Sequence, residues 1–138
     1  VIGSVLIPGA KAPKLLSRNL VKLMKPGSAF VDISIDQGGC AETSRPTSHH
    51  HPVYIEEEVV HYCVTNMPAI VPNTSTYALT NATLSYGLEI ADKGFPKAFR
   101  ENIALARGLN TYAGKITHTG VATAFGLSLT PLKEVIGA

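Results

Sequence analysis

The hydrophobic positions of the chain follow one pattern up to about residue 74 and another beyond it. In the first part, apolar and β-branched residues form short runs that predict strands at residues 1–7, 29–33, 53–55 and 59–64. Between the first two runs a helix is predicted from apolar side chains at helical spacing, namely Leu16, Leu20, Leu23 and Met24, with Ser17 as its N-cap. Runs that are apolar throughout are typical of strands covered on both faces, which indicates a parallel sheet.

The second part of the chain is mainly helical in pattern. A long helix is predicted from a cap at Thr74 or Ser75 to Asp92, with an alanine-rich face and Gly94 after it. The remaining predicted elements are a helix over 97–107, a short strand over 114–117, helical turns over 120–125 and a weakly amphipathic tail over 131–138. The order of elements predicts the α/β class, as the second half of a nucleotide-binding sheet followed by a segment that leaves it.

Composition adds two constraints to this picture. The chain has 138 residues with 12 Lys and Arg against 10 Asp and Glu, and this near-neutral balance argues against a nucleic-acid partner. Charged residues make up 16%, below the usual share of about 25%, which indicates that part of the surface is covered by a partner, another domain or another subunit. No apolar run approaches the roughly 20 residues of a membrane span.

The cysteines and the start of the chain suggest where it belongs. Cys40 and Cys63 fit no disulfide scaffold or metal knuckle, so we interpret them as small buried side chains in a reducing, cytoplasmic setting. The chain begins in strand-like sequence without an initiator Met, and no signal peptide is recognisable. We therefore expect a truncated or subdivided polypeptide.

Three loops follow predicted strands, at residues 7–9, 34–39 and 65–68. Ligands of open parallel sheets bind beyond the carboxyl ends of the strands, so these loops are the candidate site. Asp36 and Asn66 are the polar side chains there that could face a ligand. A carboxylate at this place could bind a ribose hydroxyl or a cationic group, or carry a proton. Alternatively, both residues only hydrogen-bond the turn backbone.

Other polar residues give weaker indications. The sequence has no GxGxxG run and no P-loop. The run His49–His51 is read as a solvated loop rather than a metal site, because consecutive side chains diverge. His61 and His118 are interpreted as structural, and Lys11 with Lys14 as a solvated pair rather than a phosphate site.

Several of these segments carry a family resemblance. The runs are VLIPGAKAP (5–13), KPGS (25–28), VDISIDQGGC (31–40), ETSRPT (42–47), HYCVTNMP (61–68) and PNTSTYALTNAT (72–83). Together they resemble the alanine dehydrogenases over essentially the whole chain. The transhydrogenase alpha subunit shares the fold, but the last two runs are more similar to alanine dehydrogenase.

The resemblance implies an NAD-dependent enzyme that deaminates L-alanine to pyruvate and ammonia, reversibly. It implies a Rossmann-type NAD domain inserted into a substrate domain, and a homo-oligomer, usually a hexamer. Residues 1–74 would be the C-terminal half of the NAD domain, and residues 75–138 the long connecting helix with the C-terminal part of the substrate domain. The alternatives are a non-catalytic assembly module and the equivalent portion of a transhydrogenase.

The resemblance also implies roles for single residues. Asp36 matches the catalytic aspartate of the IDQGG run, and Asn66 lies where it could help orient substrate. The positions matching cofactor contacts are Val5, Leu6, Ile33, Ser34, Ile35, Asp36, Val64, Thr65, Asn66 and Met67. No metal is implied. The family's substrate-binding Arg and Lys, its catalytic His and its Gly-rich turn match nothing here, so we expect the chain to need a missing N-terminal portion for activity.

Overall fold

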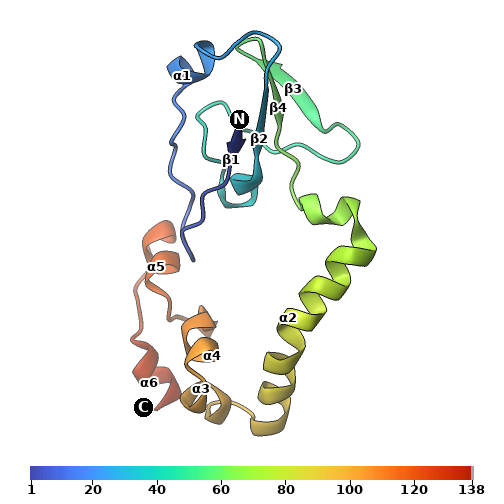
Figure 1. Cartoon of the computed structure of the whole chain (residues 1–138). Helices are drawn as coiled ribbons and strands as arrows, with labels where there is room; N and C mark the ends of the chain where they lie inside the picture. Colours follow the sequence, from blue (N-terminus) through green and yellow to red (C-terminus); the bar gives the residue numbers. More distant parts are fainter. Residues whose placement is uncertain (138) are drawn as a thin grey trace. The chain divides into compact units, whose positions relative to one another are not determined.

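The computed structural model describes residues 1–137, and the chain divides into two compact units. Unit 1 consists of Val1–Ile7 and Lys11–Val71, and unit 2 consists of Pro8–Ala10 and Pro72–Ala138. Each unit has its own sheet, so each is described by itself (Figure 1). Within residues 1–137, no helix combines the length and the apolar character needed to cross a membrane.

Unit 1 is built on a four-stranded sheet in the order β1-β2-β4-β3. The strands are β1 (Ile2–Gly3), β2 (Ala29–Asp32), β3 (Val53–Glu56) and β4 (Val59–Tyr62). β1 and β4 pair with β2 in parallel, whereas β3 pairs with β4 in antiparallel fashion at the edge. The prediction of an α/β fold with a mostly parallel sheet is confirmed.

One face of this sheet carries the core. Phe30 of β2 and Val59 of β4 are fully buried with Val21 of helix α1 (Arg18–Lys22), Cys40 and Ala41. Ser17 caps α1 as expected, since its side chain accepts a hydrogen bond from the Leu20 N–H. The interpretation of Cys40 and Cys63 as buried side chains is also confirmed.

The opposite face of the sheet stays open. On this face, four residues that pair across neighbouring strands form a row over the whole sheet, namely Ile2, Val31, Tyr62 and Val53. The two ends of that row, Ile2 and Val53, are 71% and 52% exposed within the part of the chain described. The strands of unit 1 are apolar on both faces, but unit 1 itself covers only one face of the sheet.

The first strand is much shorter than its apolar run predicts. β1 ends at Gly3, because the Val5 N–H donates to the Ser34 side chain instead of extending the ladder. Ile33, predicted as the last residue of a strand, and residues 34–37, predicted as loop, together form the 3-10 helix η1 (Ile33–Gln37), capped by the side chain of Asp32. A second 3-10 turn, η2 (Met67–Ile70), follows β4.

Unit 2 begins with the long helix α2 (Pro72–Lys93), which starts before the predicted caps Thr74 and Ser75. Gly94 follows it with a φ of 68°, as a helix C-terminus favours. Unit 2 also contains the hairpin of β5 (Thr111–Tyr112) with β6 (Lys115–Ile116). Helices α5 (Thr119–Phe125) and α6 (Leu132–Ile136) follow it (Figure 1). The tail prediction also included Ala138, which lies outside the described residues.

The predicted single helix over 97–107 is wrong, because the structure has two helices there. α3 (Lys97–Glu101) and α4 (Ile103–Gly108) are separated by Asn102 in an extended conformation. The Asn102 side chain accepts from the Ala104 N–H at 2.9 Å and donates to Glu89 of α2 at 2.6 Å. A side chain that caps a new helix and binds a neighbouring one outweighs the propensity to continue.

Candidate functional site

The carboxyl ends of β1, β2 and β4 lie at one edge of the unit 1 sheet, because these strands run in the same direction. Side chains of η1 join the three ends. The Ser34 Oγ accepts from the Val5 N–H at 2.6 Å. The Asp36 carboxylate accepts from the Asn66 N–H at 3.4 Å to each oxygen. Asp36 and Asn66, singled out in the sequence 30 residues apart, are thus neighbours at this edge.

The first of the three predicted loops needs a correction. Residues 8–10 belong to unit 2, where Gly9 lies so close to the His118 ring that a side chain at position 9 would clash with it. The loop that follows β1 at the site is therefore Ser4–Ile7, and Val5 is its anchored residue. Because β1 ends at Gly3 and not at residue 7 as predicted, the loop that follows it also begins earlier.

Asp32 fixes the loop that carries Asp36. Its buried carboxylate accepts from the Ser34 N–H at 3.0 Å, the Cys40 N–H at 2.8 Å and the Ser44 hydroxyl at 2.6 Å. A buried carboxylate is stable only when its oxygens are hydrogen-bonded in this way. Asp32 is not among the residues predicted for the site, although a charged residue between the apolar Val31 and Ile33 is unusual and is the signal by which the sequence could have indicated it.

Lys14 holds the same loop from outside. Its Nζ donates to the carbonyl oxygens of Gly38 at 2.6 Å and Gly39 at 2.9 Å. Lys11 and Lys14 are both exposed, as the prediction of a solvated pair requires, and Lys14 in addition binds these two carbonyls. Carbonyls at the end of η1 lack partners within the helix, and a lysine is suited to them.

The ten candidate cofactor residues differ in what they can offer a ligand. Five are exposed, and these are Leu6, Ile33, Asp36, Thr65 and Asn66. Val5 and Met67 are half-buried, whereas Ser34, Ile35 and Val64 are buried. The exposed members combine apolar side chains with a carboxylate and an amide, which suits a ligand that has an apolar ring and polar substituents.

Asp36 itself is accessible. Its contacts with the Asn66 N–H are long, at 3.4 Å, so its oxygens keep room for a stronger partner. These contacts agree in part with the alternative that Asp36 only hydrogen-bonds turn backbone, since its partner is the backbone N–H of Asn66. Both uses are compatible, because an ionised carboxylate offers about four acceptor positions.

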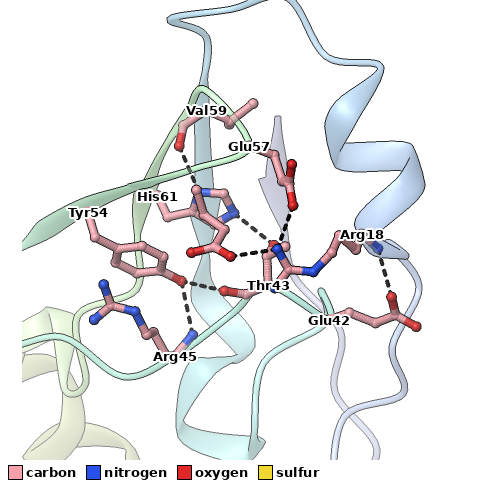
Figure 2. Close-up of polar contacts among 9 residues, drawn as sticks. Arg18, Glu42, Thr43, Arg45, Tyr54, Glu57, Val59 and His61 are labelled. Atoms are coloured by element: carbon pink, nitrogen blue, oxygen red, sulfur yellow. Dashed lines mark hydrogen bonds and ion pairs between the residues drawn. The ribbon is translucent and has the colours of Figure 1, made fainter.

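His61 lies apart from this edge and is structural, as interpreted. Figure 2 shows its ring between Thr43 and the Val59 carbonyl. The Nε2 lies 2.8 Å from the Thr43 Oγ1, and the Nδ1 lies 2.9 Å from the Val59 carbonyl oxygen. Because a carbonyl can only accept, the Nδ1 donates a proton to it, while the Nε2 is hydrogen-bonded to the Thr43 hydroxyl. The ring is fully buried and stacks on Tyr54 at 4.9 Å. Both ring nitrogens are therefore already engaged within the protein.

Tyr54 and Arg18 fix the edge strand beside it (Figure 2). The Tyr54 hydroxyl donates to the Thr43 carbonyl at 2.8 Å and accepts from the Arg45 N–H at 3.0 Å. Burial raises the pKa of this phenol well above its usual range. Arg18 pairs with Glu56 at 2.6 Å and with Glu57 at 2.5 Å, which lowers the pKa of the Glu56 carboxyl. This cluster attaches residues 43–54 to the sheet.

The other histidines differ in role. His118 caps α5, since its Nδ1 accepts from the Gly120 N–H at 3.2 Å, which supports the structural interpretation. His49, His50 and His51 are exposed, as a solvated loop requires. Within residues 1–137, no group of three or more His, Cys, Asp or Glu side chains is placed to hold a metal ion.

Comparison with known proteins supports the α/β fold described above. The family model described as the alanine dehydrogenase/PNT C-terminal domain matches residues 1–119. Alanine dehydrogenases of Halomonas elongata and Mycobacterium tuberculosis are 54% and 57% identical to 99% of this chain. A solved structure of an L-alanine dehydrogenase is 49% identical, with a TM-score of 0.72 over 91% of the chain.

A more distant likeness covers less of the chain. The transhydrogenase structure from Sinorhizobium meliloti is 29% identical, with a TM-score of 0.50 over 55% of this chain and 21% of that one. The chain spans 37% of the length of the two alanine dehydrogenases named above and 34% of the solved one. With a family match over residues 1–119 and identities above one half, the chain belongs to the alanine dehydrogenase/PNT family and carries its C-terminal domain.

Proposed function

We propose that this chain is the C-terminal portion of an alanine dehydrogenase, which reversibly converts L-alanine, NAD⁺ and water into pyruvate, ammonium, NADH and a proton. The observation that carries the proposal is the pairing of Asp36 with Asn66 at the carboxyl edge of the parallel strands. That edge is where open α/β sheets bind their ligands. The identity to alanine dehydrogenases over 99% of the chain supports it.

In this proposal Asp36 is the catalytic residue. Its exposed carboxylate would accept and return a proton, or hold the substrate and the water that releases ammonia. Asn66, the neighbour whose N–H contacts Asp36, would orient the substrate. Residues 1–74 would form the C-terminal half of the NAD domain, and residues 75–138 the connecting helix with the C-terminal part of the substrate domain.

The exposed side chains at the edge fit a dinucleotide cofactor. Leu6 and Ile33, 70% and 50% exposed, would contact an apolar ring beside Asp36. Val5, Ser34, Ile35, Val64, Thr65 and Met67 would support or complete that wall. The redox chemistry, which takes a hydride from the α-carbon of alanine, would be supplied by NAD. Phosphate contacts would come from outside this chain, since its sequence has no Gly-rich turn.

The partners of this function follow from the surfaces left open. The uncovered sheet face of unit 1 and an apolar groove of unit 2, lined by Tyr86, Ile90, Phe99, Leu105 and Leu109 among others, are available for further polypeptide. We propose that a preceding N-terminal portion of the subunit covers part of this surface. Further copies of the subunit, six in all by resemblance, would cover another part in a cytoplasmic enzyme.

A chimeric enzyme tests the proposal. This chain replaces the matched 37% of the Halomonas elongata alanine dehydrogenase, and NADH formation from L-alanine and NAD is followed at 340 nm, a wavelength at which NADH alone absorbs. We expect turnover within about tenfold of the parent enzyme, and none from this chain by itself. A folded chimera without turnover would favour a non-catalytic assembly module instead. Turnover by the chain alone would contradict the proposed need for an N-terminal portion.

A further inference from the structure

Asn66 has a backbone conformation that needs support. Its φ and ψ are 52° and 50°, in the left-handed region that side chains other than glycine seldom adopt, although Asn tolerates it better than most. The conformation matters for the site, because it turns the Asn66 N–H towards Asp36. Such a residue keeps this conformation only when its surroundings hold it there.

The Asn66 carbonyl is held from two directions. It accepts from the Ala69 N–H at 3.0 Å, within the turn that begins η2. It also lies 3.1 Å from the Nε2 of His49, which comes from a loop 17 residues earlier. Since a carbonyl oxygen has no proton to give, the Nε2–H of His49 is the donor.

The loop around His49 is attached to the same strand end. The Thr47 N–H donates to the Cys63 carbonyl at 2.9 Å, and the Thr65 N–H donates to the Thr47 carbonyl at 3.2 Å. The Thr47 hydroxyl donates to the Pro52 carbonyl at 2.9 Å, and the His51 N–H donates to the Ser48 carbonyl at 3.2 Å. These hydrogen bonds close a tight turn and attach it to the end of β4, so the backbone of the loop holds His49 beside Asn66.

Only the first of the three histidines has this contact. His50 and His51 are exposed, and neither side chain forms a hydrogen bond of this kind within residues 1–137. Consecutive side chains on a turn point in different directions, which explains why one of three similar residues reaches the carbonyl. The run is therefore not uniform, and His50 offers a natural control.

We propose that His49 is a positioning residue for the site, whose Nε2–H holds the Asn66 carbonyl and so keeps the Asn66 N–H directed at Asp36. The importance of this contact for ligand binding rests on the proposed function. The contact between His49 and the Asn66 carbonyl does not depend on that function, because it is part of the structure of unit 1. His49 touches neither Asp36 nor a ligand in this arrangement and acts through Asn66 alone.

Amide exchange by NMR on the whole chain tests the inference. His49→Leu removes the donor, His49→Gln keeps an N–H that can reach a carbonyl, and His50→Leu is the matched control. We expect His49→Leu to raise the water-exchange rate of the Asn66 amide about two- to fivefold, as the loss of one exposed hydrogen bond predicts. The three-bond HN–Hα coupling of Asn66, which reports φ, should change with it.

The pattern across variants separates positioning from general damage. His49→Gln should restore most of the protection, His50→Leu should leave it unchanged, and the signals of buried Phe30 and Val59 should not move in any variant. Unchanged exchange and coupling in His49→Leu, or an equal effect of His50→Leu, would overturn the inference. If His49→Leu fails to fold, His49→Gln decides the question, because its Asn66 signals must then match those of the unmodified chain.

A titration with NADH of the Halomonas elongata chimera that carries the same substitutions keeps the two claims apart. We expect His49→Leu to weaken NADH binding about two- to fivefold and His50→Leu to leave it unchanged. Failure of the chimera without these substitutions to bind NADH would count against the proposed cofactor role. In that case the exchange rate of the Asn66 amide would still decide whether His49 positions this residue.

Discussion

At the residue scale, the loop that carries Asp36 depends on how closely Gly39 and Asp32 approach each other. Gly39 has a φ of 75°, and an added Cβ would lie 2.6 Å from the Cβ of Ser44 and 2.8 Å from the Asp32 Oδ2. Glycine is required there for both backbone and space. Gly38 next to it also has a positive φ, of 98°, but nothing lies within 4 Å of the position of its Cβ.

This difference predicts unequal costs for two neighbouring alanine substitutions. Gly39→Ala should lower the free energy of unfolding of unit 1 by about 2–5 kcal/mol, because strain and overlap add. Gly38→Ala should cost only about 1–2 kcal/mol, from the backbone alone. Urea unfolding followed by the NMR signals of Phe30 and Val59 measures both. Equal costs would mean that the Asp32 network does not constrain the loop.

At the scale of elements, the sequence pattern predicted the helices and strands that depend on interactions between residues near one another in the chain. The apolar runs located β2 and β4 to within two residues, and Ser17 marked the start of α1. β1 was overestimated because Ser34, 29 residues away, takes the Val5 N–H. The break at Asn102 depends on Glu89, 13 residues earlier. Contacts between distant residues leave no periodic signal in the sequence.

The break between α3 and α4 yields a second stability prediction. Asn102→Ala removes the cap of α4 and should lower the free energy of unfolding of unit 2 by about 0.5–2 kcal/mol. Asn110→Ala, at an exposed asparagine of the same unit, should stay within about 0.5 kcal/mol. Asn102→Asp should lower the free energy of unfolding of unit 2 at neutral pH. The new carboxylate still caps α4, but it repels the carboxylate of Glu89.

Thermal unfolding followed by circular dichroism compares the three variants. The Asn102→Asp deficit should shrink with added salt, which screens the repulsion between two partly exposed carboxylates. A neutral effect of Asn102→Ala would show that α3 and α4 do not need the cap. In that case the chain would tolerate the continuous helix that its sequence pattern predicts.

At the scale of the whole molecule, topology made the candidate site predictable. Asp36 and Asn66 meet because their strands are parallel neighbours, a consequence of the strand order and not of any motif. Asp32, Lys14 and His49 escaped sequence reasoning because each acts through a backbone group far along the chain. The low charged fraction of 16% agrees with the open apolar faces of both units.

The most direct test of the proposed catalytic edge is the turnover of the chimeric enzyme with Asp36→Asn. Glu58→Gln is the matched control, because this exposed carboxylate lies in the turn before β4, whereas Asn66 follows β4 at its other end. We predict that Asp36→Asn lowers kcat for L-alanine about 10²- to 10⁴-fold while Glu58→Gln leaves it within about twofold. An Asp36→Asn enzyme that keeps more than about half of the turnover would contradict the catalytic role of this edge.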